Sequence, residues 1–424
     1  MKHYMMLISI FIFTAIISLI NQMIYAYYFG TSSSFDMLNA VLALPLSIIG
    51  VGNGAITLII MPILNEAKKK YGNCVYVLVD LIKKYILHII LLTIILVMIQ
   101  IILLQNRVDT TQKDELIYLS LFVGIYLFLN FINSFFVVYF NFKKKFILAS
   151  INALVIYIFS IIMCLLFAKT IGVKIVIFSF IFSNMVLLFY FIMIFVNDFK
   201  KLSIKQKIIS FKIELKVLLS GIFSILPFTL PIFIDSYFLL ALGSGNLSYV
   251  SYANKIIIMI STILIQPLNL ILFPKILMKI SSKKFIEIKI MLFYLYVFVL
   301  LGVVLIYIFS KLFFLDFMHI FFENGIFTSN DSKKINNVFL FYLIGAFGMV
   351  SMNIQNKVLT SLKLYKIQIF GSLSFIICYI FLLNFLLQIK GYLSSGIVYM
   401  ICWIFYSSFI MLYINKYLIL KKED

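Results

Sequence analysis

Charged residues are scarce in this chain of 424 residues, since only 12% are Asp, Glu, Lys or Arg and 64% are hydrophobic. A soluble globular protein needs more charge than this on its surface, so the composition excludes that class. Apolar stretches of about 20 residues recur along the whole chain, which is the length a helix needs to cross the hydrocarbon core of a bilayer. The sequence therefore predicts an all-α, polytopic membrane protein.

Cysteine and histidine are also rare and are scattered along the chain. Cys74, Cys164, Cys378 and Cys402 have no metal-ligand spacing, and the three histidines are isolated. Neither a metal site nor a disulfide framework is therefore predicted. The sequence has no Ser-His-Asp set and no phosphate-binding glycine loop of an ATPase. We expect a chain that is not an enzyme, has no cofactor and does not hydrolyse ATP.

The apolar stretches divide into twelve predicted spans with short loops between them. They cover residues 4–29, 35–64, 80–104, 116–140, 146–168, 172–196, 215–242, 247–274, 286–315, 335–361, 366–388 and 393–418. The first is too long for a cleavable signal peptide and lacks a small-residue cleavage site, so we expect it to be a span. The loops are too short to form a soluble domain on either side.

Lysine and arginine are distributed unequally between the two faces that these spans define. One face, which includes both termini, carries 25 of the 35 residues, the other carries 8, and two lie within spans. By the positive-inside rule the richer face is cytoplasmic, which predicts a multi-pass protein of a bacterial inner membrane with both termini in the cytoplasm. The net charge of +20 is spread over short loops, where it suits anionic lipid headgroups, so nucleic acid is not a predicted partner.

The two halves of the chain resemble one another at a spacing of 212 residues. The stretch 40–64 aligns with 252–277, and six predicted spans separate equivalent points. Six spans preserve orientation, so the repeat predicts two pseudo-symmetric six-helix lobes, residues 1–205 and 206–424. Parallel repeats place a pseudo-twofold axis along the membrane normal, with a substrate site between the lobes.

Proline is rare and confined to three of the twelve predicted spans. The six prolines, all in the second, seventh and eighth spans, are Pro45, Pro62, Pro227, Pro231, Pro267 and Pro274. Each proline removes a helix hydrogen bond and bends the chain, although proline is also common in membrane helices. We predict that Pro45, Pro267 and the glycines Gly50, Gly52 and Gly54 are gating or hinge positions.

Four charged residues stand out within the predicted spans: Asp36, Asp235, Lys255 and Lys357. A charge in hydrocarbon costs at least about 2.5–3.5 kcal/mol, so each should face a cavity or a partner. Asp235 and Lys255 lie at similar depths on neighbouring spans, which fits either a structural salt bridge or a substrate-binding cation positioned by an acid. Asp36 fits either a gate or coupling residue or an acid in a first helical turn. Lys357 fits either a substrate contact or a snorkelling side chain.

Several motifs follow one another in the two halves of the chain. They are FG at 29–30, Asp36, LP at 44–45, NGA at 53–55, PIL at 62–64, YANKI at 252–256, FFENGIFTSNDS at 321–332 and TSLKLYK at 360–366. Together they resemble the MurJ/MviN family, the lipid II flippases of the multidrug/oligosaccharidyl-lipid/polysaccharide exporter superfamily. The resemblance implies a flippase that moves an undecaprenyl-diphosphate-linked saccharide from the cytoplasmic to the outer leaflet by alternating access.

The resemblance also implies which residues contact the substrate. Lys255 and Lys357 match basic positions of the family, and Asn53 matches an acid or amide of its first motif. Asn21 and Gln22 add polar groups at a depth similar to that of Asp235, so these six residues form the predicted substrate site.

Two departures from the family bear on the substrate. The family usually has fourteen spans, and positions that carry cavity arginines there read Ala15 and Asn21 here. A lysine such as Lys255 is a point charge that cannot form the paired contact that arginine makes with phosphate. A capsule or O-antigen-type unit is therefore an alternative substrate to lipid II.

Two other functions stay open on the sequence alone. A drug or cation antiporter of the same superfamily would favour acids in the cavity, and Asp36 and Asp235 are consistent with that. A membrane polysaccharide polymerase would need a large external loop with clustered Arg, His and acidic residues, whereas the longest external loop predicted here, near 316–334, has about twenty residues. Without a nucleotide site, transport would be coupled to the membrane potential, H⁺ or Na⁺.

The expected partners are the lipid-linked saccharide, membrane lipids and the cell-wall or polysaccharide synthesis machinery.

Overall fold

The computed structural model describes residues 2–71, 74–199 and 215–423, without the side chains of 263–274 and of some residues near the gaps and ends. The helices of this part of the chain are α1 (Lys2–Phe29), α2 (Ser33–Tyr71), α3 (Val75–Leu104), η1 (Thr110–Gln112), α4 (Lys113–Phe142), α5 (Phe146–Ile171), α6 (Lys174–Phe199), α7 (Leu215–Leu239), η2 (Leu240–Leu242), α8 (Asn246–Ser281), α9 (Phe285–Phe321), α10 (Ser329–Ser361), α11 (Tyr365–Lys390) and α12 (Leu393–Glu423). The predicted all-α class is confirmed.

The α-helices follow the predicted spans in order along the chain. Among the described residues, 11 helices are long and apolar enough to cross a membrane. The remaining α-helix is α8. It contains residues 263–274, of which the structure describes the backbone but not the side chains. Hydrophobic length alone therefore located the helices, because in hydrocarbon a backbone must satisfy its own hydrogen bonds.

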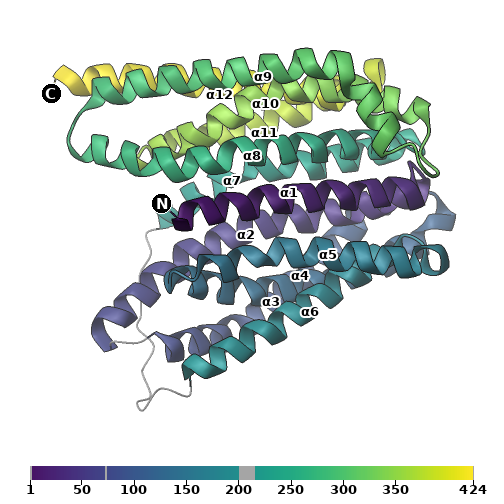
Figure 1. The fold of residues 1–424 in the computed structure, drawn as a ribbon, viewed down its shortest axis with the longest axis horizontal. Helices are drawn as coiled ribbons and strands as arrows, with labels where there is room; N and C mark the ends of the chain where they lie inside the picture. Colours follow the sequence, from purple (N-terminus) through teal and green to yellow (C-terminus); the bar gives the residue numbers. More distant parts are fainter. Residues whose placement is uncertain (1, 72–73, 200–214, 424) are drawn as a thin grey trace. The chain divides into compact units, whose positions relative to one another are not determined.

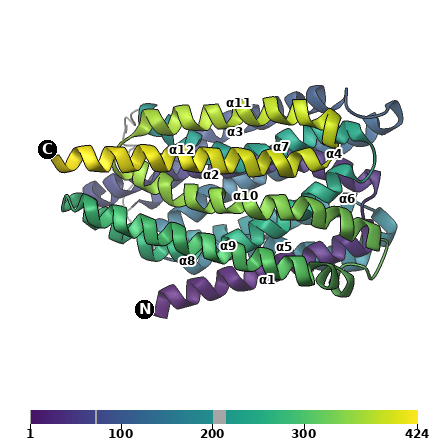
Figure 2. The ribbon, with the colours of Figure 1, turned by 90° about the horizontal axis from the view of Figure 1, so that it is seen from above.

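The helices form two compact units. One, unit 1, joins Met1–Asp36 to Leu226–Asp424, and the other, unit 2, comprises Met37–Ile225. Within unit 1, α10 packs against α8, α9 and α12, and α1 packs against α8 (Figure 1, Figure 2). The predicted boundary between lobes, at residues 205 and 206, lies outside the described residues, and that division stays a prediction. The α1–α8 contact joins the first and second halves of the chain.

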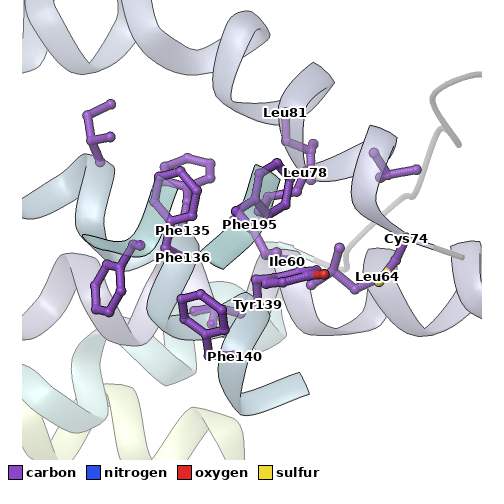
Figure 3. Packing of buried hydrophobic residues seen from close by; sticks show 14 of the residues in the cluster. Ile60, Leu64, Cys74, Leu78, Leu81, Phe135, Phe136, Tyr139, Phe140 and Phe195 are labelled. Carbon is purple, nitrogen blue, oxygen red and sulfur yellow. The ribbon is translucent and has the colours of Figure 1, made fainter. Parts of the chain in front are cut away.

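Unit 2 has an aromatic core between α2, α3, α4 and α6 (Figure 3). Phe136, Tyr139 and Phe140 of α4 lie in this core, and the rings of Tyr139 and Phe195 meet edge to face at 5.2 Å. Edge-to-face pairs stabilise a core beyond the area they bury. Asn133 of α4 donates to the Asn184 side chain of α6 at 3.0 Å, so a polar pair also links these helices.

Glycines allow α10 and α12 to approach one another closely in unit 1. A Cβ atom at Gly348 would lie 2.3 Å from the carbonyl oxygen of Trp403, and one at Gly345 would lie 2.6 Å from the Tyr399 ring. Small residues let membrane helices approach backbone to backbone, which is a main source of packing energy in lipid. The Gly345–Gly348 face of α10 thus fixes its position against α12.

Replacing Gly348 with alanine should therefore destabilise unit 1. The added methyl group meets backbone atoms that cannot rotate away, and overpacking of this kind typically costs about 1–3 kcal/mol. We expect a lower melting temperature of the purified protein in detergent. Gly302→Ala in α9 is the matched control, because no atom lies within 4 Å of its added Cβ. Equal melting temperatures for the two variants would contradict the packing described here.

Candidate functional site

The carboxylate of Asp36 joins the first turn of α2 to the start of α8. Its Oδ1 accepts from the Ser248 backbone N–H at 2.7 Å and from the Ser248 hydroxyl, and its Oδ2 accepts from the Gly245 N–H. The residue before α8 is Gly245, which has φ 88° and no side chain to accept from the free N–H groups of the helix. Asp36 supplies that missing cap from another helix, and its negative charge suits the helix N-terminus.

Asp36 and Ser248 are separated by 212 residues, the spacing of the sequence repeat. Equivalent helix starts of the two halves therefore bind one another directly. The two sequence interpretations of Asp36 are compatible, because it lies in the first turn of α2 and also clamps α8. We call the Asp36–Gly245–Ser248 contact the clamp.

Next to the clamp, an aromatic box surrounds the ammonium group of Lys255. Its Nζ lies 5.4 Å from the ring centroid of Phe35 and 5.9 Å from those of Tyr25 and Tyr252. The hydroxyl of Tyr252 donates to the carbonyl of Gly30 at 3.1 Å, which ties the box to the turn between α1 and α2. Ring faces attract a cation, so these three rings suit an ammonium group.

Asp235 is bound by tyrosine side chains. Tyr342 of α10 donates to its carboxylate at 3.0 Å, and Tyr379 of α11 donates at 2.9 Å. Asp235 is only 3% exposed, and the ion pairs among the described residues do not include one between Asp235 and Lys255. Two tyrosine hydroxyls, and not the Lys255 ammonium, supply the hydrogen bonds that the buried carboxylate needs. The other interpretation, in which Asp235 positions a substrate-binding Lys255, stays a prediction.

A small cavity lies beside Asp235 within unit 1. Asn254, Tyr399 and Trp403 contribute to its lining, together with apolar side chains. The indole N–H of Trp403 is buried and has no hydrogen-bond partner in the part of the chain that the structure describes. The cavity has room for about one water molecule, which could bond to these polar groups, and it is too small for an organic ligand.

Tyr342→Phe and Tyr379→Phe should each destabilise the protein by about 1–3 kcal/mol, because each removes one donor to a buried carboxylate. The loss of stability in the double variant should differ from the sum of the two single losses, because the two hydroxyls share one acceptor. Melting temperatures of the purified variants measure this. Strict additivity would contradict a shared carboxylate, and Tyr294→Phe on the exposed face of α9 is the control.

The other residues predicted for the substrate site in unit 1 lie on α1 and α10. Asn21 and Gln22 are buried in α1, and neither side-chain polar atom of Asn21 has a hydrogen-bond partner among the described residues. Buried amides of this kind are rare in proteins, so Asn21 is a candidate contact for a bound group. Lys357 is half-buried in α10, and its carbonyl accepts from the Ser361 hydroxyl.

Asn53 belongs to unit 2, where its side-chain oxygen accepts from Ser134 of α4. The adjacent glycines lie at close approaches, since a Cβ atom at Gly52 would be 2.4 Å from the Phe131 ring and one at Gly54 2.3 Å from Ile225. These two glycines thus have a packing role, and their hinge role stays a prediction.

The remaining gating positions lie on α2 and α8. α2 is one continuous helix through the buried Pro45 and the half-buried Gly50. Pro267 lies in α8, but its side chain is outside the described residues. Their gating role stays a prediction.

The model of the family described as lipid II flippase MurJ matches residues 25–423. The chain belongs to the MurJ family. The resemblance predicted from the motifs is thus confirmed, and it covers nearly the whole chain. The MurJ family consists of membrane transporters that act as flippases, which agrees with a multi-pass membrane protein that is not a catalytic enzyme.

Solved structures show the same fold. A lipid II flippase MurJ in an inward closed conformation is 19% identical with a TM-score of 0.74, covering 97% of this chain and 87% of its own. An inward-facing multidrug resistance MATE transporter of the MOP superfamily is 12% identical with a TM-score of 0.74, covering 97% and 96%. A mutant of the Vibrio cholerae MATE transporter VcmN is 15% identical with a TM-score of 0.62, covering 99% and 98%. A search of curated proteins finds no match.

The sequence did not identify the residues that hold the acidic groups of this MurJ-family member. Tyr342 and Tyr379 bind Asp235, and Gly245 and Ser248 bind Asp36. One signal could have indicated the clamp, because Ser248 is the repeat counterpart of Asp36. No comparable signal marks the tyrosines, since 26 tyrosines are distributed along the chain.

Proposed function

We propose that this MurJ-family chain is a flippase for an undecaprenyl-diphosphate-linked saccharide and that it works by alternating access. The observation that carries the proposal is the clamp, in which Asp36 binds the N-terminus of α8 beside the Lys255 box. With both termini cytoplasmic, the clamp lies on the outer side of the membrane. The clamp would hold the starts of α2 and α8 together on that side, as the cytoplasm-facing half of the cycle requires.

Lys255 would attract the diphosphate of the substrate. Its ammonium group is half-buried and lies among three aromatic rings. A charge-assisted hydrogen bond to phosphate is about twice as strong as a neutral one, and it strengthens in a site of low dielectric. Lys357, Asn21 and Gln22 of unit 1 would provide further polar contacts, while the lipid tail stays in the bilayer. A substrate contact of Asn53, in unit 2, stays a prediction.

The driving force would be the membrane potential or a gradient of H⁺ or Na⁺. One elementary charge that crosses the membrane gains about 2.3 kcal/mol per 100 mV. The protein would act in the bacterial inner membrane with partners from cell-wall or polysaccharide synthesis. The lysine-rich cytoplasmic loops would bind anionic membrane lipids.

A drug or cation antiporter is the second candidate function. The observation in its favour is the similarity to an inward-facing MATE transporter, with the same TM-score as the MurJ structure. The buried Asp36 and Asp235 suit a cationic substrate, whereas Lys255 would repel one. Substrate charge therefore separates the two candidates.

The substrate can be tested in a bacterium whose own lipid II flippase is switched off. We expect this chain to restore growth and to move lipid II to the outer leaflet. If the chain instead restored export of a capsule or O-antigen-type unit in a mutant that lacks this export, and did not restore lipid II transport, that unit would be the substrate. Rescue of neither, together with lowered accumulation of a cationic drug, would overturn the proposal in favour of the antiporter.

A further inference from the structure

The loop between α9 and α10 carries the FFENGIFT motif, which the proposed substrate site does not use. This loop lies on the C-terminal end of α1, where the N–H of Ile326 donates to the carbonyl of Tyr27 at 3.2 Å. A Cβ atom at Gly325 would lie 2.3 Å from the carbonyl oxygen of Tyr27 and 2.7 Å from its Cα. The approach is possible only because residue 325 has no side chain.

A second contact links the start of α10 to the turn between α1 and α2. Asp331 forms a capping box with Thr328, in which its Oδ2 accepts from the Thr328 N–H at 2.8 Å. Its Oδ1 accepts from the Thr31 hydroxyl at 3.0 Å. One carboxylate therefore caps α10 and also binds the turn that leads into the clamp.

The inner side of the loop is buried against the aromatic box. The Phe327 ring meets Tyr252 edge to face at 5.6 Å, and Phe322 meets the same ring at 6.3 Å. All three side chains are almost fully buried. Since Tyr252 also borders Lys255, the loop contacts the wall of the box that surrounds the proposed substrate cation.

The loop is held at its base as well. Glu323 accepts from the hydroxyl of Ser332 and lies 2.9 Å from the His319 ring nitrogen. Both ends of the loop are thus fixed to the helices they join, so the loop is preorganised for its contact with α1.

We infer that residues 322–331, which we call the clasp, form a second latch that works with the clamp. The clasp holds the end of α1 through its backbone contact with Tyr27, and this contact must break before α1 can move and open the outer side. This inference rests on the proposed alternating access. If the clasp only stabilised the fold, breaking it would raise access to the end of α1 no more than Gly348→Ala does, which destabilises unit 1 without touching α1.

The test measures access to the last turn of α1. Ala26 is fully buried there, so an Ala26→Cys reporter should react slowly with a membrane-impermeant thiol reagent in intact cells. Adding Gly325→Ala should raise the labelling rate about tenfold or more, because the methyl group displaces the clasp from Tyr27. Gly302→Ala, whose added Cβ contacts nothing, should leave the rate unchanged.

A second variant keeps the test decisive if Gly325→Ala does not fold. Thr31→Val preserves the side-chain shape and removes only the hydrogen bond to Asp331, and we expect it to raise labelling about threefold to tenfold. Unchanged labelling in a folded Thr31→Val protein would overturn the clasp. Labelling requires no substrate, so it tests the clasp separately from the proposed function. If labelling rose but the wild-type chain moved no lipid-linked saccharide, the clasp would be supported and the proposed function overturned.

Discussion

Asp36→Ala is expected to reduce transport at least about tenfold and to lower the melting temperature of the protein. The change leaves the N–H groups of Gly245 and Ser248 without their acceptor at a buried helix start. An unsatisfied buried donor costs about 1–3 kcal/mol, and loss of a helix cap costs about 0.5–2 kcal/mol. Without the clamp the outer side would not close reliably, so the cycle would stop. Transport and melting are measured on the same purified variant.

Two variants control for the loss of the Asp36 charge. Asp114 lies exposed in the first turn of α4, so Asp114→Ala should leave both measurements unchanged. Asp36→Asn keeps one acceptor oxygen and should have an intermediate effect. Wild-type transport and melting in Asp36→Ala would show that the clamp has no role.

Lys255→Ala is expected to lower transport by about 10- to 100-fold, since a hydrogen bond to a charged group contributes about 1.5–3 kcal/mol. Lys255→Arg should retain transport of a diphosphate-linked substrate, because its guanidinium can bind two phosphate oxygens at once. Lys255→Glu should abolish transport by repelling the diphosphate. The readout is the initial rate of substrate appearance in the outer leaflet at equal expression.

The control for Lys255 is another lysine with an aromatic neighbour. Lys311 of α9 lies 5.7 Å from the Tyr307 ring centroid but is exposed, so Lys311→Ala should transport normally. If Lys255→Ala and Lys255→Glu transported as well as the wild type, Lys255 would not contact the substrate.

The helices could be predicted from the sequence because lipid leaves few alternatives. An apolar stretch long enough to cross the bilayer must be helical, so hydrophobic length located α1–α12 without tertiary information. Helix ends were predicted less well, since α2 continues to Tyr71, beyond the predicted end at residue 64. Lys68, Lys69 and Lys70 extend its last turn, where cations are favourable to the helix dipole.

The site could be predicted only in part. Asp36, Asp235 and Lys255 were identified because an isolated charge in hydrocarbon is costly, but the partner of each depends on how the helices are rotated and packed. Two tyrosines satisfy Asp235, and nothing in the local pattern of α10 or α11 indicates them. Equal depth made a salt bridge between Asp235 and Lys255 conceivable, but depth does not tell in which direction each side chain points.

The clasp, too, could be predicted only in part: its motif can be recognised in the sequence, whereas its contacts depend on tertiary structure. The FFENGIFT motif was recognisable as a family feature, but its contact with α1 joins residues about 300 positions apart. Gly325 matters because of the Tyr27 backbone, and no spacing in the sequence predicts that approach. A glycine in a loop is otherwise expected for conformational freedom alone.

The most direct test of the central claim is a leaflet assay in vesicles that contain only the purified protein. A fluorescent undecaprenyl-diphosphate-linked saccharide is placed in the leaflet that contacts the cytoplasmic face, and an impermeant reagent destroys the probe that reaches the opposite leaflet. With a membrane potential or an H⁺ or Na⁺ gradient applied in turn, we expect wild-type protein to transfer the probe and Lys255→Ala to transfer it at least about tenfold more slowly. Transfer no faster than in protein-free vesicles under every gradient would contradict the account.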